Sequence, residues 1–382
     1  MINHGSIEGF EPPPYPYDRL TPIKTVASSH DGGAVDLSVG VPYDPAPETV
    51  VQALASSGAE RSYPPSIGTE EFRRAAAGWL NRLLELTSPL SADDVRATIG
   101  SKEFVAGLPH WLRLRTPKKD TVLYPSVSYP SYAMGATLAG CRAVPVRVDE
   151  NWRLDMSSIS DDDKNRALCL WVNSPANPTG ALDDLEAIAD WGAAHDVLVV
   201  SDECYIEFTW DEAPSSILAT EAAQSTQDRY GGFLAVHSLS KRSNLAGARA
   251  GFYAGDQELL HYLGEVRKHA GFMPPGPTQA AGVAAFVDEQ GVIEQKATYR
   301  SRMERLISLF GRFDIDVAMP GGGFYLWVPA PHGDAWAFTE RLAADLGMIV
   351  SPGEFYGEAA KEYVRVAAVQ PLEQLDLIER RM

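Results

Sequence analysis

The fold of this chain is decided by the stretch Ala235-Val236-His237-Ser238-Leu239-Ser240-Lys241-Arg242-Ser243-Asn244-Leu245-Ala246-Gly247-Ala248-Arg249-Ala250-Gly251-Phe252. Residues 233–236 are apolar and predict a buried strand, which breaks into a small polar turn that carries Lys241. Desolvation at the end of a buried strand lets a lysine lose its proton and form a Schiff base with a carbonyl group. The serines before Lys241 and Arg249 after it are groups that bind a phosphate monoester. Taken alone, such a turn is more often a surface loop, so the rest of the chain must supply the other parts of a site.

Length and composition are those of an ordinary globular chain. Its 382 residues are enough for two domains with buried cores, and 45% hydrophobic with 22% charged residues is a typical balance. The net charge of -18 argues against nucleic acid and anionic membranes as partners. The N-terminus shows no secretory signal, and no apolar run approaches the ~20 residues that span a bilayer.

The three cysteines, Cys141, Cys169 and Cys204, lie in apolar, strand-like contexts, at spacings that fit no metal site. They are typical of reduced core cysteines. We therefore expect a cytoplasmic protein without a bound metal and without a membrane or nucleic-acid partner.

Strands and helices alternate from residue 95 onward, which predicts an α/β fold with a mainly parallel sheet covered by helices. The expected strands are residues 95–99, 121–124, 142–146, 167–173, 197–200 and 233–236, with another from residue 250. The nearly uninterrupted apolar run 167–173 is typical of a strand buried on both faces.

The C-terminal third predicts a smaller α+β domain. A long amphipathic helix is expected at residues 292–310, a further helix at 335–346, and strands at 314–317, 323–328 and 363–366. Residues 1–24 are rich in proline and aromatic side chains, too irregular for a helix, and predict an arm that lies across the protein's own body or a partner subunit. We expect a large domain over residues 36–278, with 1–35 and 279–382 forming the arm and the small domain.

Polar side chains follow several of these strands, at the edge where open α/β sheets bind their ligands. Asp202, Tyr205 and Asn177 each come shortly after a buried strand. A carboxylate at Asp202 suits a protonated pyridine nitrogen, while Tyr205 and Asn177 suit the phenolic oxygen of pyridoxal phosphate (PLP). Taken singly, the alternatives are a capping aspartate, a core tyrosine and a turn asparagine.

A phosphate cup is predicted where Gly100-Ser101-Lys102-Glu103 ends a strand and opens a helix, because the first amides of a helix bind anions. Ser238 and Arg249 would complete it. Tyr129 is a candidate to stack on the cofactor ring, with a core aromatic as the equal alternative. Arg365, a charge in an apolar strand, predicts a carboxylate ligand, with a structural salt bridge as the alternative.

Together these motifs resemble the class I/II aminotransferases, which are PLP-dependent enzymes of fold type I. The resemblance covers Gly40 to Arg365 and rests on Asn-Pro-x-Gly, Asp-x-x-Tyr, Ser-x-x-Lys and the arginine eight residues after the lysine. It implies a large domain with a mainly parallel seven-stranded sheet between helices, a smaller α+β domain, and a homodimer with shared active sites.

The resemblance also implies a role for each matching residue. Lys241 would form the Schiff base and act as the general acid/base, and Asp202 would pair with the pyridine nitrogen. Asn177 and Tyr205 would bind the phenolic oxygen. The implied phosphate ligands are Ser101, Lys102, Ser238, Arg249 and, from the neighbouring subunit, Tyr63. Arg365 would bind the substrate α-carboxylate, and Gly40 matches the glycine of the flexible substrate loop.

Within this family, Ser-Leu-Ser-Lys-Arg-Ser-Asn-Leu-Ala-Gly-x-Arg-Ala-Gly resembles the actinobacterial N-succinyldiaminopimelate aminotransferases of lysine biosynthesis, as does the arm motif at residues 15–24. One departure is the ring-stacking segment, where Tyr129 stands in place of the usual tryptophan or other aromatic. We expect transamination between N-succinyl-LL-2,6-diaminopimelate and 2-oxoglutarate.

Other functions remain open on the sequence alone. The substrate could be aspartate, an aromatic amino acid or a precursor of a specialised metabolite, and the same fold catalyses carbon–sulfur β-elimination. A non-catalytic effector-binding module of a transcription regulator is disfavoured, because no basic helix-turn-helix segment precedes the fold. A nicotinamide-dependent enzyme is disfavoured because no G-x-G-x-x-G follows the early strands.

Overall fold

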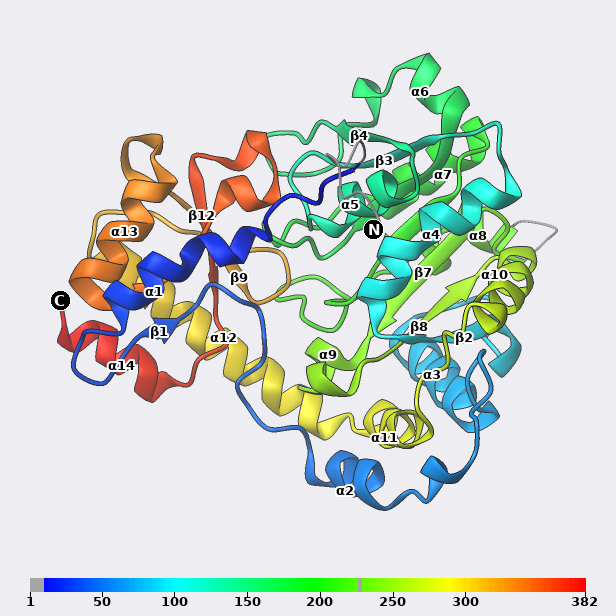
Figure 1. Ribbon diagram of the computed structural model, residues 1–382, viewed down its shortest axis with the longest axis horizontal. Coiled ribbons are helices and arrows are strands. Elements are labelled where there is room, and N and C mark those ends of the chain that lie inside the picture. The colour runs from blue at the N-terminus through cyan, green and yellow to red at the C-terminus, as the bar shows by residue number, and fades with distance from the viewer. Residues whose placement is uncertain (1–9, 226–228) are drawn as a thin grey trace, which may run out of the picture.

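A seven-stranded sheet forms the centre of the larger part of the chain in the computed structural model, which describes residues 10–225 and 229–382 (Figure 1). Only β8 runs against the other strands, since it pairs antiparallel with both of its neighbours. In sheet order the strands are β2 (Val95–Ile99), β8 (Ala250–Gly255), β7 (Phe233–Ser238), β6 (Val199–Asp202), β5 (Ala167–Asn173), β3 (Thr121–Pro125) and β4 (Arg142–Val146). The prediction of a mainly parallel α/β sheet is confirmed.

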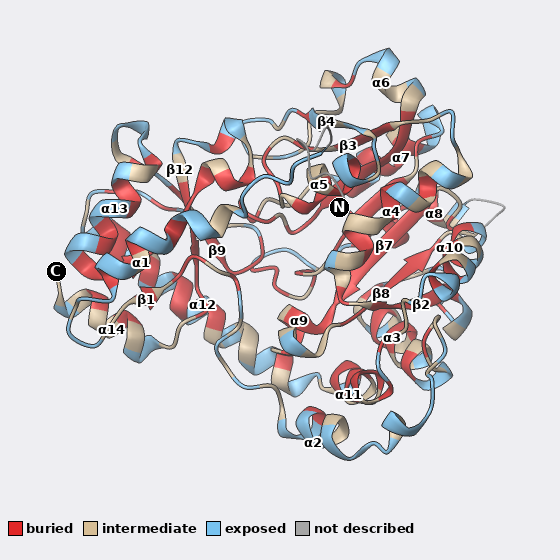
Figure 2. Ribbon diagram, in the orientation of Figure 1, coloured by how far each residue is buried: buried red, intermediate tan, exposed pale blue. Residues whose placement is uncertain are grey.

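Helices cover both faces of this sheet, so that its strands are mostly buried, with the exception of the edge strand β4 (Figure 2). Alternate residues of β5 enter two different cores, with Leu170 and Val172 in one and Cys169 and Trp171 in the other. The first core takes side chains from α3 (Glu70–Leu83), α7 (Leu185–His195) and α11 (Gly276–Val287), and the second from α4 (Ser101–Arg115), α5 (Ser131–Leu138) and α10 (Gln257–His269). Burial on both faces explains why β5 is apolar without alternation.

A second sheet lies in the smaller part of the chain. Its order is β11 (Ser351–Pro352), β12 (Tyr363–Ala367) and β9 (Tyr325–Pro329), all antiparallel. A further parallel pair joins β1 (Val35–Asp36) to β10 (Met348–Ile349). The helices of this part are α1 (Thr21–Ala27), α12 (Gln290–Gly311), α13 (Ala335–Leu346) and α14 (Leu372–Arg380).

The remaining helices are short or peripheral: α2 (Glu48–Ser56), α6 (Asp161–Arg166), α8 (Glu221–Ser225) and α9 (Leu239–Arg242). The helix α11 packs against α2 and α3, and β1 pairs with β10 in the smaller part. The limits of the two domains stay a prediction.

Two local predictions are wrong. Residues 314–317 form no strand, because Asp314 has a left-handed backbone (φ 57°) and Ile315 and Val317 are buried by side-chain packing without a strand pairing. The arm is not irregular throughout, since residues 16–27 form a 3-10 helix followed by α1. Ile23 and Ala27 recur at helical spacing and bury one face of α1.

Candidate active site

A cavity of about 420 Å³ lies at the carboxyl ends of β5, β6 and β7, where they face β9 and β12 of the smaller part. Its wall contains residues from both parts of the chain and from the arm. Of the residues predicted for the site, those that line this cavity are Gly40, Ser101, Lys102, Tyr129, Asn177, Asp202, Tyr205, Ser238, Lys241, Arg249 and Arg365. The fold therefore brings together residues that are up to 350 positions apart, from Tyr15 to Arg365.

Lys241 lies in α9, a single helical turn directly after β7. Ser238 begins this turn by accepting a hydrogen bond from the backbone N–H of Ser240 at 3.2 Å. The Lys241 Nζ points into the cavity and donates to the carbonyl oxygen of Gly40. Burial, together with the positive charge of Arg365, lowers the pKa of Lys241 to about 8. A substantial share of this amine is therefore neutral near pH 8 and able to act as a nucleophile.

One end of the cavity is built to bind an anion. The first turn of α4 opens toward it without a side-chain cap, so its backbone amides remain available. Gly100 precedes this turn with φ 70°, and a Cβ there would overlap the guanidinium of Arg249. Ser101 and Ser238 add hydroxyls to the same wall. This combination of helix amides, guanidinium and hydroxyls suits a phosphate monoester.

Asp202 supplies a buried carboxylate at the end of β6. Its Oδ2 accepts from the hydroxyl of Tyr132 at 2.9 Å, and its Oδ1 accepts from the backbone N–H of Cys204 at 3.3 Å. The carbonyl oxygen of Asp202 accepts from the amide of Asn173 at 2.8 Å, which fixes the end of β6 against β5. Burial raises the pKa of Asp202, so a cationic partner in the cavity would be needed to favour its charged form.

Arg365 is 2% exposed and lies in the middle of β12. Its Nη1 donates to Asn177 Oδ1 at 2.7 Å, and its Nη2 donates to the carbonyl oxygen of Ser38 at 2.6 Å and to the Tyr17 hydroxyl at 3.1 Å. None of the ion pairs between described residues involves Arg365, and its Nε has no hydrogen-bond partner among them. A buried guanidinium without a carboxylate partner is a strong site for a ligand anion.

Two aromatic groups form the remaining walls. The hydroxyls of Tyr205 and Tyr325 are 2.8 Å apart, and the ring of Tyr325 packs against Arg365. On another wall, the ammonium of Lys102 lies 5.8 Å from the ring centre of Tyr129 and 5.3 Å from that of Tyr15. The arm therefore crosses the chain's own cavity, which is one of the two placements expected for it.

Tyr63 is the one predicted site residue that does not line the cavity. Its side chain is 93% exposed, in a loop between α2 and α3. Its predicted role is toward a neighbouring subunit, which this geometry leaves untested.

The sequence prediction missed several residues of the cavity wall: Tyr17, Tyr132, Asn173, Cys204 and Tyr325. It also missed Ser38, whose carbonyl oxygen accepts from Arg365. The sequence contains a signal for Cys204, because this residue lies between Asp202 and Tyr205. Side chains alternate in direction along a strand, so Cys204 is expected on the same side as Asp202. Tyr325 and Tyr17 carry no such signal, since only the packing of the smaller part and the arm against the sheet brings them here.

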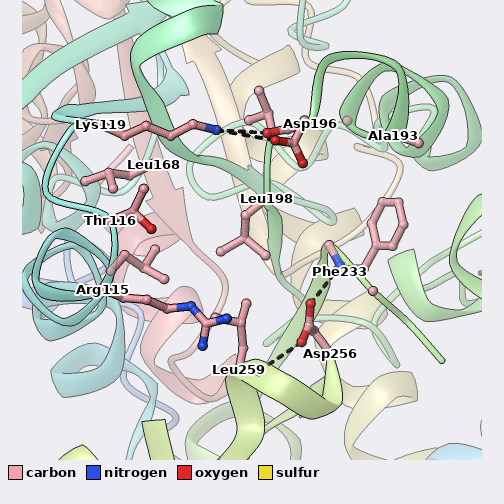
Figure 3. Close-up of a pocket in the computed structure, with 15 residues that line it drawn as sticks. Arg115, Thr116, Lys119, Leu168, Ala193, Asp196, Leu198, Phe233, Asp256 and Leu259 are labelled. Atoms are coloured by element: carbon pink, nitrogen blue, oxygen red, sulfur yellow. Dashed lines mark hydrogen bonds and ion pairs between the residues drawn. The ribbon is translucent and has the colours of Figure 1, made fainter. Parts of the chain in front are cut away.

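A second cavity, of about 520 Å³, lies at the opposite, amino-terminal edge of the sheet (Figure 3). Lys119 donates to the carbonyl oxygen of Asp196 at 3.0 Å, and Asp256 accepts from the backbone N–H groups of Gly232 and Leu259. Lys119 and Asp256 of this second cavity are therefore already hydrogen-bonded to neighbouring protein groups. Volume alone does not identify the site, whereas the converging polar groups at the carboxyl edge do.

The described part of the chain shows neither a metal-binding cluster nor a membrane-spanning helix. Within residues 10–225 and 229–382, no group of three or more His, Cys, Asp or Glu side chains is arranged to hold a metal ion. In the same residues, no helix combines the length and apolar character needed to cross a membrane.

The residues of the cavity fit PLP. At the anion end, Gly100 leaves room for the Arg249 guanidinium. Asp202 is a buried carboxylate in the wall, and Lys241 is an amine of lowered pKa that lines the same cavity. These are an anion cup, a partner for a protonated ring nitrogen and a carrier for the aldehyde.

Comparison with known proteins agrees with this geometry. Residues 33–380 match the family model described as aminotransferase class I and II. The 4-dedimethylamino-4-oxo-anhydrotetracycline transaminase OxyQ of Streptomyces rimosus is 41% identical, over 94% of this chain and 95% of that protein. An LL-diaminopimelate aminotransferase of Aquifex aeolicus is 32% identical, over 95% of this chain and 94% of that protein.

Solved structures give the same result. An aminotransferase of Neisseria meningitidis superimposes with a TM-score of 0.87 at 32% identity, covering 97% of both chains. A probable N-succinyldiaminopimelate aminotransferase of Thermus thermophilus superimposes with a TM-score of 0.84 at 30% identity, covering 96% of this chain and 98% of that one. The chain belongs to the class I and II aminotransferases. It is a PLP-dependent enzyme of fold type I that transfers amino groups.

Proposed function

We propose that this aminotransferase acts on N-succinyl-LL-2,6-diaminopimelate, with 2-oxoglutarate as the amino acceptor. One observation supports transamination as the reaction type. Arg365 is buried and has no carboxylate partner among the described residues. It lines the same cavity as Lys241, whose lowered pKa lets its amine lose a proton. Both the amino donor and 2-oxoglutarate present an α-carboxylate to such a guanidinium.

The proposed mechanism assigns a role to each group of the cavity. Bound PLP supplies an aldehyde for the amino group and an electron sink for the carbanion formed at the α-carbon. Arg365 binds the α-carboxylate and orients the α-carbon toward Lys241. The Nζ of Lys241 would hold the cofactor and, as a free amine, would act as the general base and general acid that moves the proton of the substrate α-carbon. Asp202 keeps the ring nitrogen protonated, because a buried carboxylate favours a proton-bearing partner.

The proposed cofactor contacts divide between the two ends of the cavity. At the phosphate end we propose Ser101, Lys102, Ser238 and Arg249, which lie around the uncapped first turn of α4. At the phenolic oxygen we propose Tyr205 and Asn177, and on the ring face Tyr129. Gly40, whose carbonyl oxygen accepts from Lys241, belongs to the loop that would contact the substrate.

The choice of donor is supported by resemblance at two levels. The lysine segment and the arm motif of this chain resemble those of N-succinyldiaminopimelate aminotransferases. Proteins named as diaminopimelate or N-succinyldiaminopimelate aminotransferases match nearly the whole chain at 30–32% identity. The reaction would place the enzyme in lysine and diaminopimelate biosynthesis.

Amination of a specialised metabolite is the second candidate. It is supported by OxyQ, a relative at 41% identity that is named as a transaminase of an oxo-anhydrotetracycline. In that reaction the amino donor would still place its α-carboxylate on Arg365, but the acceptor would be a ring ketone. The two candidates therefore share every cofactor contact and differ in the amino donor and the acceptor.

We also propose a homodimer with shared active sites in the cytoplasm. Tyr63, between α2 and α3, is an almost fully exposed aromatic side chain, and Val41 and Tyr43, before α2, are also exposed. Aromatic side chains are enriched at protein interfaces. The absence of a disulfide among the three cysteines is consistent with a reducing compartment.

A panel of amino donors with 2-oxoglutarate tests the proposal, with glutamate formation as the measured product. We expect the highest kcat/KM for N-succinyl-LL-2,6-diaminopimelate and no glutamate from Lys241→Ala. A preference for aspartate would overturn the proposed donor. Turnover only when glutamate is the donor and a polycyclic ketone the acceptor would favour the second candidate, and turnover retained in Lys241→Ala would overturn the role of the lysine.

A further inference from the structure

Tyr325, at the start of β9, touches two of the groups proposed for binding and catalysis. Its hydroxyl lies 2.8 Å from the hydroxyl of Tyr205, with the two rings nearly edge-to-face. The Arg365 guanidinium carbon lies 4.1 Å from the centre of the Tyr325 ring, close enough for a cation–π contact. Tyr325 is buried, so both contacts are shielded from water.

A third contact restricts the position of Tyr325. A Cβ at Gly40 would overlap its hydroxyl, so the loop that carries the carbonyl acceptor of Lys241 closes against this side chain. Phe324 also restricts the Tyr325 ring, because it packs against both Tyr205 and Tyr325. Tyr325 therefore has little freedom to turn away from Tyr205.

We propose that Tyr325 is a positioning residue that acts through Tyr205: its hydroxyl holds and polarises the phenol that faces the phenolic oxygen of PLP, while its ring supports Arg365. One side chain of the smaller part thereby orients a cofactor ligand of the sheet and the carboxylate ligand of β12. This inference rests on the proposed role of Tyr205.

The physical effect follows from hydrogen-bond cooperativity. When Tyr325 donates to the Tyr205 oxygen, the Tyr205 hydroxyl becomes a stronger donor to a negatively charged oxygen in front of it. A stronger donor would stabilise the anionic phenolic oxygen of PLP, and the Lys241 Nζ that holds the cofactor would then lose its proton at a lower pH. Removing the Tyr325 hydroxyl should have the opposite effect.

The experiment is a spectrophotometric pH titration of the purified, PLP-loaded enzyme, which reports the midpoint of its visible absorbance change without turnover. We expect Tyr325→Phe to raise the midpoint by about 0.5–1 pH unit, the size of one hydrogen bond of ordinary strength. Tyr205→Phe should raise it further. In Tyr205→Phe/Tyr325→Phe, the second substitution should add no shift, because its effect passes through the Tyr205 hydroxyl.

Tyr356→Phe is the matched control. Tyr356 also lies beside Arg365, at 4.8 Å, but its hydroxyl bonds to that of Tyr17 rather than to Tyr205. The midpoint of the absorbance change in Tyr356→Phe should equal that of the unchanged enzyme. Because Tyr325→Phe keeps the ring against Arg365, its KM for 2-oxoglutarate should stay within about twofold, whereas Tyr325→Leu, which loses the ring, should raise it.

The outcomes separate the two proposals. An unshifted midpoint in Tyr205→Phe overturns the proposed role of Tyr205 itself. A shift in Tyr205→Phe with none in Tyr325→Phe overturns only the role of Tyr325. A Tyr325→Phe shift that persists in the double variant shows that Tyr325 does not act through Tyr205, and this also overturns the inference.

Discussion

Lys241 shows how far the surroundings of one residue change its chemistry. An exposed lysine would be almost fully protonated at neutral pH, but burial and the nearby charges of Arg365 and Arg249 lower the pKa of this amine to about 8. With a lowered pKa, the charged form is present below pH 8 and is lost as pH rises through that value. The reactive neutral amine therefore appears within a pH range where the protein can operate.

The first prediction concerns the capture of PLP by protein from which the cofactor has been removed. The rate constant should rise about tenfold per pH unit below pH 8 and level off above it, because only the neutral Lys241 amine reacts. Stopped-flow absorbance measures this. In Arg365→Gln, which removes a positive charge, the plateau should begin at higher pH. A plateau near pH 10.5 in the unchanged protein would contradict the lowered pKa.

The second prediction concerns Arg365. Arg365→Lys should lower kcat/KM by about 100-fold, or roughly 2.7 kcal/mol, because a lysine cannot form the paired hydrogen bonds that a guanidinium offers a carboxylate. The loss should be similar for the amino donor and for 2-oxoglutarate, since both use the same site. Retained PLP absorbance would show that the variant is folded. A loss confined to one substrate would contradict a shared carboxylate site.

At the scale of elements, the helix α4 combines two conditions for the anion end of the cavity. Its first turn is left without a side-chain cap, and Gly100 before it has a backbone conformation that favours glycine. The same glycine leaves space for the guanidinium of Arg249. The strand-to-helix turn therefore positions both the amides and the arginine.

The third prediction compares two glycines that both have a positive φ, 70° at Gly100 and 63° at Gly140. Gly140→Ala should cost about 1 kcal/mol of unfolding free energy. Gly100→Ala should cost more, because its ψ of 166° is nearly restricted to glycine and its Cβ would overlap Arg249. Only Gly100→Ala should also weaken PLP binding, by tenfold or more, because nothing lies within 4 Å of a Cβ at Gly140. Thermal unfolding and PLP titration measure the two effects. Equal PLP affinity in both variants would show that Gly100 does not shape the phosphate end.

Elements with a strong local pattern could be predicted from the sequence, and those that depend on distant partners could not. The β5 run is apolar at every position but its last, and its burial on both faces followed directly. The segment 314–317 is also apolar in alternation, but it pairs with none of the described strands. For α1, the proline-rich composition concealed the helical spacing of two buried residues.

At the scale of the whole molecule, the cavity exists only because three separate regions meet. Lys241 and Asp202 come from the sheet, Arg365 and Tyr325 from the smaller part, and Tyr17 from the arm. Residues that follow strands could be expected at the sheet edge from the sequence alone. The tyrosines of the opposite wall could not, because their placement depends on how the smaller part and the arm pack against that edge.

The last prediction concerns the assembly, since Tyr63 lies outside the cavity of its own chain and its proposed contact is with PLP in a second copy. The protein should sediment with twice the 41.5 kDa mass of the chain. Tyr63→Phe should weaken PLP binding by about tenfold, because one hydrogen bond to a charged phosphate oxygen is lost. Tyr43→Phe makes the same change at a tyrosine that lies before α2 and is 60% exposed, and it should leave PLP affinity unchanged. A monomer that binds PLP tightly, or a Tyr63→Phe variant with unchanged affinity, would contradict a shared active site.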